Sequence, residues 1–91
     1  MSLHLIFSPA GARACLHRWS ADDRILLLGD GVYAANQFAQ SHVPANAIYM
    51  LASDAEARGI TENERGGIRL IDYKQLVELT EEHSLIVSWR D

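Results

Sequence analysis

The fold class of this chain follows from one stretch, Ile25-Leu26-Leu27-Leu28-Gly29-Asp30-Gly31. Its four consecutive apolar residues predict a strand that is buried on both faces, as in a parallel sheet covered by helices. The two glycines that follow predict a tight turn from this strand into a helix. A strand that leads directly into a helix is the repeating unit of α/β proteins, so the stretch predicts that fold class.

Further strands and helices are predicted on either side of this unit. Apolar, β-branched and aromatic residues predict four more strands, at residues 3–7, 47–51, 68–71 and 85–89. Five strands that alternate with helices predict an α/β sandwich with a mostly parallel five-stranded sheet. We expect residues 1–91 to form this single domain.

Four helices are predicted between the strands. The first begins at Ser8-Pro9, because serine caps free N–H groups and proline fits the first helical position. The second covers residues 32–39 and the fourth runs from residue 73 to about residue 83. Ser53 and Glu56 have the spacing of a capping box for the third, which stops at Gly59. Residues 61–67 are polar and rich in glycine, and are predicted to be an exposed loop.

Composition and charge limit the classes of function. The chain has 91 residues, of which 48% are apolar, and a domain of this size buries only about 60–65% of its unfolded surface. We therefore expect it to cover its surplus apolar surface with other subunits. The formal charge is −4 and the eight basic residues are scattered, so direct binding of nucleic acid is not expected.

The sequence also predicts a cellular location. A single cysteine excludes an internal disulfide and fits a reducing compartment. No run of 18 apolar residues is present, and no basic segment followed by a long apolar stretch opens the chain. We expect a cytoplasmic protein without a membrane span.

Residues 29–34 match the pattern G-x-G-x-x-A, and Asp54 lies about 20 residues further on, as in a dinucleotide-binding fold. The pattern, however, follows the second predicted strand, and 91 residues leave no room for a second mononucleotide-binding half. The favoured interpretation is a tight strand-to-helix turn in which Asp30 caps the helix. A small nucleotide-binding module is the alternative, and no cofactor is predicted.

Cys15 is the only candidate nucleophile. It lies about two turns into the first predicted helix, on one apolar stripe with Ala12, Leu16 and Trp19. A reactive cysteine needs an electropositive, partly open site, whereas a cysteine on an apolar stripe behaves as a small buried hydrophobe. The residues favour the unreactive interpretation, with Arg18 as the one neighbour that could assist a thiolate.

No metal site is predicted. The four histidines have neither an i, i+4 histidine partner nor a nearby pair of cysteines. The acidic pairs Asp22-Asp23 and Glu81-Glu82 are expected to be solvated charges at helix ends.

In order along the chain, these segments resemble the DsrH/TusB family. The matching pieces are Ser8-Pro9, residues 28–35, Ile48-Tyr49-Met50-Leu51, Asp54, Ala57-Arg58-Gly59, Ile71-Asp72-Tyr73, residues 77–80, His83 and Ser88-Trp89. Each piece is weak alone, whereas the ordered set covers nearly the whole chain and is fairly specific.

This resemblance implies a three-layer DsrEFH-like α/β fold and a hetero-oligomer with TusC/DsrF-like and TusD/DsrE-like subunits. It implies that such a complex takes persulfide sulfur from a TusA-like carrier and passes it to a TusE/DsrC-like protein. The route would serve 2-thiolation of the tRNA wobble uridine, or alternatively sulfur oxidation. The chain would be an accessory subunit of a sulfurtransferase complex rather than an enzyme on its own.

The resemblance also bears on Cys15. The sulfur-carrying cysteine of the TusD/DsrE-type subunit lies near the loop after the third strand, where this chain has Ala52-Ser53-Asp54 and no thiol. Some DsrH-type members have a cysteine in the first helix, and Cys15 matches it. Cys15 is therefore the candidate for an auxiliary persulfide site.

Overall fold

A five-stranded sheet forms the centre of the computed structural model, which describes residues 1–90. The strands are β1 (Ser2–Ile6), β2 (Arg24–Leu27), β3 (Ile48–Leu51), β4 (Arg69–Ile71) and β5 (Leu85–Trp89). Their order across the sheet is β4-β3-β2-β1-β5, and every neighbouring pair is parallel. The predicted α/β class and five-stranded parallel sheet are therefore confirmed, and each predicted strand overlaps an observed one.

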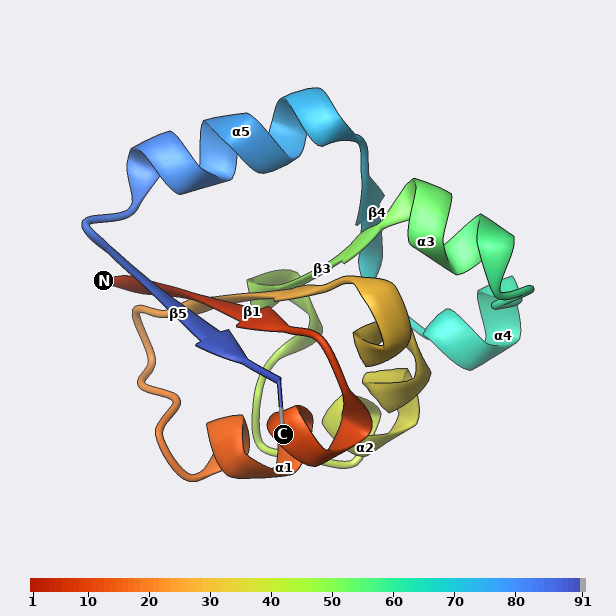
Figure 1. Cartoon of the computed structure of the whole chain (residues 1–91). Coiled ribbons are helices and arrows are strands. Elements are labelled where there is room, and N and C mark those ends of the chain that lie inside the picture. Colours follow the sequence, from red (N-terminus) through yellow and green to blue (C-terminus); the bar gives the residue numbers. More distant parts are fainter. Residues whose placement is uncertain (91) are drawn as a thin grey trace.

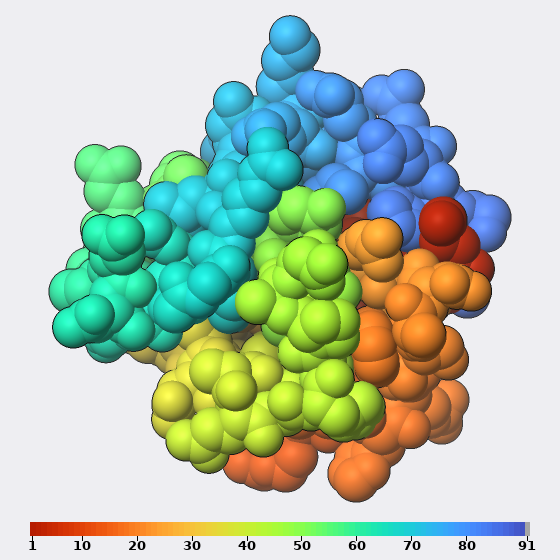
Figure 2. Space-filling model, turned by 180° about the vertical axis from the view of Figure 1, so that it is seen from behind, coloured from red at the N-terminus to blue at the C-terminus, as the bar shows by residue number. Residues whose placement is uncertain are grey.

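Helices cover both faces of this sheet, which gives three layers (Figure 1). The α-helices are α1 (Pro9–Leu16), α2 (Ala35–Ala39), α3 (Ala52–Ala57), α4 (Glu62–Arg65) and α5 (Tyr73–Glu82). Two 3₁₀ helices, η1 (Gly29–Ala34) and η2 (Ala45–Ala47), precede α2 and β3. Helices α1 and α2 lie on one face and α5 lies on the other (Figure 1). In the back view, α5 is blue at the top, α2 is yellow at the bottom, and the segment that leads into β3 is green between them (Figure 2).

The handedness of the crossovers explains this arrangement. Parallel crossovers are right-handed, so a helix changes face when the chain changes direction across the sheet. From β1 to β4 the chain moves steadily towards one edge. It then returns past three strands to place β5 on the free side of β1, and the connecting helix α5 consequently lies on the opposite face.

The burial of β2 supports the strand prediction from the apolar run. Ile25, Leu26 and Leu27 are all fully buried. Ile25 and Leu27 pack into the core under α1 and α2, whereas Leu26 packs into the smaller core under α5. A strand that contributes to two cores has to be apolar at every position, and this is the pattern that the sequence shows.

Three local predictions were wrong. Residues 61–67 are not all loop, because α4 lies within them and is closed by a capping box between Thr61 and Glu64. Helix α3 starts at Ala52 behind Leu51 without a side-chain cap, so the predicted Ser53 cap does not form. The helix predicted over residues 32–39 begins earlier, at Gly29, with Leu28 as its N-cap. It is a 3₁₀ helix through Ala34 and becomes an α-helix only in α2.

Candidate functional site

The carboxyl ends of parallel strands are the usual place for a ligand, at the point where the chain reverses its direction across the sheet. Here that point lies between β1 and β5. Contacts within the chain span it: the Ser8 hydroxyl donates to the Arg90 carbonyl at 2.6 Å, and the Phe7 N–H donates to the Trp89 carbonyl at 2.9 Å. The Arg90 guanidinium also lies 4.2 Å from the centre of the Phe7 ring. These contacts tie the two strand ends together rather than hold a crevice open.

The G-x-G-x-x-A segment is bound by an acidic side chain of the same protein. Asp54, on α3, accepts a hydrogen bond from the Gly29 N–H at 2.7 Å. Arg58 lies 3.8 Å from the other Asp54 oxygen and donates to Asp30 at 3.0 Å. The prediction that Asp30 caps the following helix is therefore wrong, because its carboxylate pairs with Arg58 instead.

The second glycine of this segment has a packing role. A Cβ atom at Gly31 would lie 1.8 Å from the Ile6 carbonyl oxygen, so only glycine lets η1 approach β1 this closely. In dinucleotide-binding folds the second glycine lets the backbone approach a pyrophosphate. Here the approach is to the strand β1 of the same chain.

We predict no meaningful binding of nicotinamide or flavin nucleotides. The Asp54 carboxylate accepts the Gly29 N–H that a phosphate would use, and its negative charge would repel a phosphate. Titration calorimetry with NAD, NADP and FMN measures this, and heats at the level of buffer dilution are expected. Saturable binding below about 10 μM, roughly 7 kcal/mol, would restore the nucleotide hypothesis.

Cys15 lies in the interior of the α1 layer. The cysteine is fully buried, as is Ala12, and Leu16 and Trp19 pack against the same core, so the predicted apolar stripe is confirmed. Burial, together with the smaller effect of the negative charge of Asp23, raises the pKa of the Cys15 thiol to about 12. Both effects disfavour the thiolate, which is the form that reacts with persulfide sulfur.

A buried polar network that the sequence analysis missed joins β1, β5 and the residue before β2. Asp23 accepts a hydrogen bond from His4 Nε2 at 2.9 Å, and the Trp89 indole N–H donates to His4 Nδ1 at 3.0 Å. Because an indole nitrogen can only donate, Nδ1 must accept, and the imidazole proton resides on Nε2. Asp23 also accepts the backbone N–H groups of Ser2 and Ser20, at 3.0 and 3.1 Å.

The expectation that Asp23 is a solvated charge was wrong, since the residue is 6% exposed. Burial by itself would raise its pKa, but the hydrogen bonds from His4, Ser2 and Ser20 outweigh burial and hold the pKa below the ordinary value of 3.8. No local sequence pattern predicts this network, because Asp23 and Trp89 lie 19 and 85 residues from His4 in the sequence. It contains no thiol that could carry sulfur, and its hydrogen bonds hold β1, β5 and the residue before β2 together.

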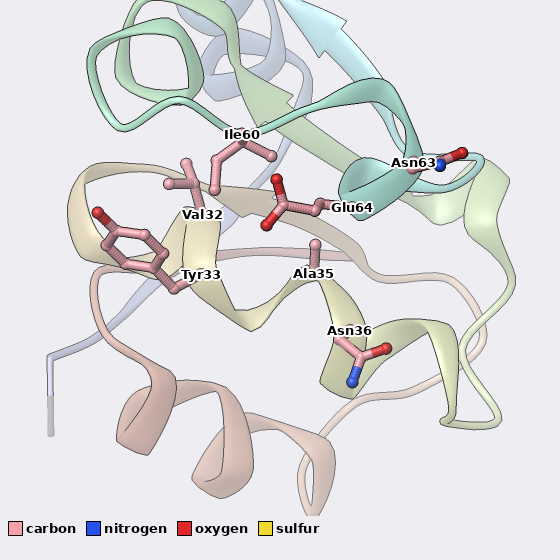
Figure 3. Close-up of a pocket in the computed structure, with 7 residues that line it drawn as sticks. All are labelled: Val32, Tyr33, Ala35, Asn36, Ile60, Asn63 and Glu64. Atoms are coloured by element: carbon pink, nitrogen blue, oxygen red, sulfur yellow. The ribbon is translucent and has the colours of Figure 1, made fainter.

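A groove of about 300 Å³ lies between the η1–α2 segment and α4 (Figure 3). Its lining residues are Val32, Tyr33, Ala35, Asn36, Ile60, Asn63 and Glu64. In Figure 3 the Glu64 carboxylate points into the groove, between Ile60 and Ala35. Glu64 accepts hydrogen bonds from the N–H and hydroxyl of Thr61, which lower its pKa. The lining offers neither a thiol for sulfur nor a cation for phosphate.

Metal-binding clusters and membrane-spanning helices are both absent from residues 1–90. Within that range the structure brings together no three histidine, cysteine, aspartate or glutamate side chains that could hold a metal ion. None of the helices in the described part of the chain is long and apolar enough to cross a membrane.

Exposed apolar side chains are concentrated on α5 and β5. Tyr73 and Val77 on α5 are 62% and 51% exposed, and Leu85 and Ile86 on β5 are 56% and 44% exposed. Val77 lies within the helix that was predicted from residue 73 to about residue 83, and its side chain faces solvent. Exposed apolar side chains that gather on one part of a surface usually mark a contact with another protein.

Comparison with known proteins agrees with this picture of a small α/β protein. The family model described as "DsrH like protein" matches residues 7–85. Protein TusB of Serratia proteamaculans is 41% identical over 80 residues, and protein TusB of Escherichia coli K12 is 40% identical over 81 residues. Each of these alignments covers 84% of both chains. A Thermotoga maritima protein solved by NMR matches with a TM-score of 0.69 and 27% identity, over 90% of this chain and 93% of that one.

Proposed function

The chain belongs to the DsrH-like family, and from this premise we propose that it is an accessory subunit of a cytoplasmic sulfur-relay complex. The complex passes persulfide sulfur for 2-thiolation of the tRNA wobble uridine. The match to the family model over residues 7–85 and the TusB relatives at about 40% identity support a role in sulfur relay and tRNA modification.

The observation that carries the accessory role is the position of the lone thiol. Cys15 is fully buried with a pKa raised to about 12, and the loop after β3 has Ala52-Ser53-Asp54 in place of a cysteine. A subunit without an accessible thiolate cannot accept persulfide sulfur directly. The sulfur is therefore carried by cysteines of the partner subunits, and this chain helps to hold them in position.

The partners in this proposal are TusC/DsrF-like and TusD/DsrE-like subunits. The exposed apolar side chains on α5 support such an assembly. A chain of 91 residues buries only a small core, and covering these side chains with a partner would add to its stability. TusA-like and TusE/DsrC-like carriers would reach the chain only through the complex.

Co-expression tests this assembly. The chain is tagged and produced with a TusC/DsrF-like and a TusD/DsrE-like subunit, and size exclusion is followed by intact-mass measurement. One complex that contains all three chains is expected, with a mass increase of one sulfur atom on a partner cysteine after incubation with a persulfide donor. A chain that elutes alone at micromolar concentration, in the presence of both partners, contradicts the proposal.

A second candidate function gives Cys15 the sulfur-carrying role, in tRNA thiolation or in sulfur oxidation. It rests on the single thiol in α1. The Cys15→Ser variant separates the two hypotheses, because a hydroxyl cannot hold sulfane sulfur.

We predict that Cys15→Ser costs about 1–2 kcal/mol of stability, since it buries a hydroxyl in an apolar core. Cellular tRNA thiolation should stay above half of the wild-type level, measured by mass spectrometry of digested tRNA. Cys15→Ala is the matched control, because it removes the thiol without adding a hydroxyl. Thiolation at the level of a full deletion, with the variant complex still assembled, would make Cys15 the carrier.

A further inference from the structure

His4 binds two other parts of the chain through the two nitrogens of one ring. The residue is 4% exposed, with Nε2 at 2.9 Å from the Asp23 carboxylate and Nδ1 at 3.0 Å from the Trp89 indole nitrogen. Because the indole can only donate, the bond to Trp89 exists only while Nδ1 carries no proton. The bond to Asp23 has no such condition, since Nε2 carries a proton in this neutral tautomer and in the imidazolium alike. The protonation state of His4 therefore decides whether β5 is held.

The charged and titratable groups around His4 keep their charge in the pH range near neutrality where histidine exchanges its proton. Asp23 stays a carboxylate there, because its pKa lies below the ordinary value of 3.8. The Cys15 thiol on α1 stays neutral, because its pKa is about 12. Arg24, which donates to the Asp23 carbonyl at 3.3 Å, and Arg90, which follows β5, stay cationic. The other basic residues of the α1 segment are exposed to solvent: Arg13, His17 and Arg18.

We propose that His4 is a proton-operated latch on the carboxyl end of β5. When the ring takes a proton from solvent at Nδ1, an N–H of His4 faces the N–H of Trp89 across 3.0 Å, and two donors cannot form a hydrogen bond. The new positive charge at the same time strengthens the bond to the Asp23 carboxylate. One proton thus exchanges the bond to β5 for a stronger bond beside β2. The latch consists of contacts within the chain and is independent of the sulfur-relay proposal.

Release of Trp89 affects the strand ends that the chain otherwise ties together. The Trp89 carbonyl accepts the Phe7 N–H at 2.9 Å, and the next carbonyl, of Arg90, accepts the Ser8 hydroxyl at 2.6 Å. Figure 1 shows the carboxyl end of β5 beside α1, where a Cβ atom at Gly11 would lie 3.1 Å from the Trp89 Cβ atom. An indole that turns away from His4 therefore moves a tightly packed strand end. The place between β1 and β5 where the chain reverses its direction opens at low pH and closes at high pH.

NMR of the full chain from about pH 8 to about pH 5 tests the latch. At the upper end, the Trp89 indole N–H should be protected from hydrogen exchange. On acidification its exchange, corrected for the intrinsic effect of pH on the rate, should become about 5-fold faster, the equivalent of one hydrogen bond. The Phe7 N–H should follow, whereas the Leu28 N–H, which donates to Ile6 on the other side of β1, should not. An indole signal and a protection that stay constant between the two pH values overturn the proposal.

Variants separate the latch from a general loosening in acid. His4→Gln keeps a donor and an acceptor but does not titrate, so the Trp89 indole N–H should stay protected over the whole range. Trp89→Phe removes the indole donor, so the protection of the Phe7 N–H should no longer depend on pH, and this variant decides if the glutamine variant fails to fold. The matched control is His42→Gln, which removes a histidine that packs against Trp19, with ring centres 5.5 Å apart, and should keep the transition. A transition that persists in His4→Gln or Trp89→Phe, or that is lost in His42→Gln, overturns the proposal.

Discussion

Replacing Gly31 by alanine should destabilise the domain by about 3–5 kcal/mol, the largest effect expected of any small substitution in this chain. The new Cβ atom would lie 1.8 Å from the Ile6 carbonyl oxygen and 2.6 Å from the Ile6 carbonyl carbon. Both are backbone atoms of the interior strand β1, so no side-chain rotation relieves the overlap. Either η1 moves away from the sheet or β1 shifts against its two neighbours, and each movement opens the packed core.

Urea unfolding followed by circular dichroism measures this loss as a lower midpoint at unchanged slope. Gly59→Ala is the matched control, because a Cβ at Gly59 meets nothing within 4 Å and only its positive φ of 66° opposes the substitution. That variant should lose about 1 kcal/mol. A Gly31→Ala midpoint equal to that of Gly59→Ala would mean that η1 can move away from β1 at little cost.

Replacing Asp23 by alanine should cost about 3 kcal/mol. The change removes the acceptor of three hydrogen bonds, from His4, Ser2 and Ser20, and leaves the Nε2–H of the buried His4 without a partner. His4 in turn accepts the Trp89 indole N–H, so the variant should also loosen β5. Thermal unfolding measures the loss, and Asp22→Ala is the control, because Asp22 is exposed and should change stability by less than about 0.5 kcal/mol.

The same residue makes a signed prediction about pH. The pKa of Asp23 is lower in the folded chain than its ordinary value of 3.8, so its stabilisation is present above that value. The stabilisation is lost as pH falls through the lower, folded-state pKa, because protonation then removes the acceptor. The stability difference between wild type and Asp23→Ala should therefore shrink below pH 3.8. A difference that stays constant down to the acid limit would show that Asp23 does not act as a buried carboxylate.

These effects bear on the position of β5 as well. Trp89 ends β5 and is held through its indole by His4, while Gly11 passes so close that a Cβ there would lie 2.4 Å from the Trp89 carbonyl oxygen. The carboxyl end of β5 is thus fixed against β1 and α1.

Much of the fold could be predicted from local patterns. The apolar run of residues 25–28 predicted a strand buried on both faces, and Ser8-Pro9 predicted the start of α1, where the Ser8 hydroxyl accepts the Gly11 N–H. The stripe through Cys15 predicted its burial. Each of these signals comes from residues that lie within one strand or two helical turns of one another. Periodicity and capping depend only on such near neighbours, so the sequence shows them directly. The same rules missed α4, because its four residues are too few to show a period.

The site residues depend on contacts between distant segments. Asp54 binds Gly29 across 25 residues, and Asp23 binds His4 across 19. Neither pair has a local signature: Asp23 had the pattern of a solvated acid, and Asp54 had the spacing of the acid in a dinucleotide-binding fold. Their environments follow from strand order, which places β1 between β2 and β5 and brings the carboxyl ends of β2 and β3 together. Local patterns set the elements of this protein, and their packing sets the electrostatics, because charges respond to neighbours in space rather than in sequence.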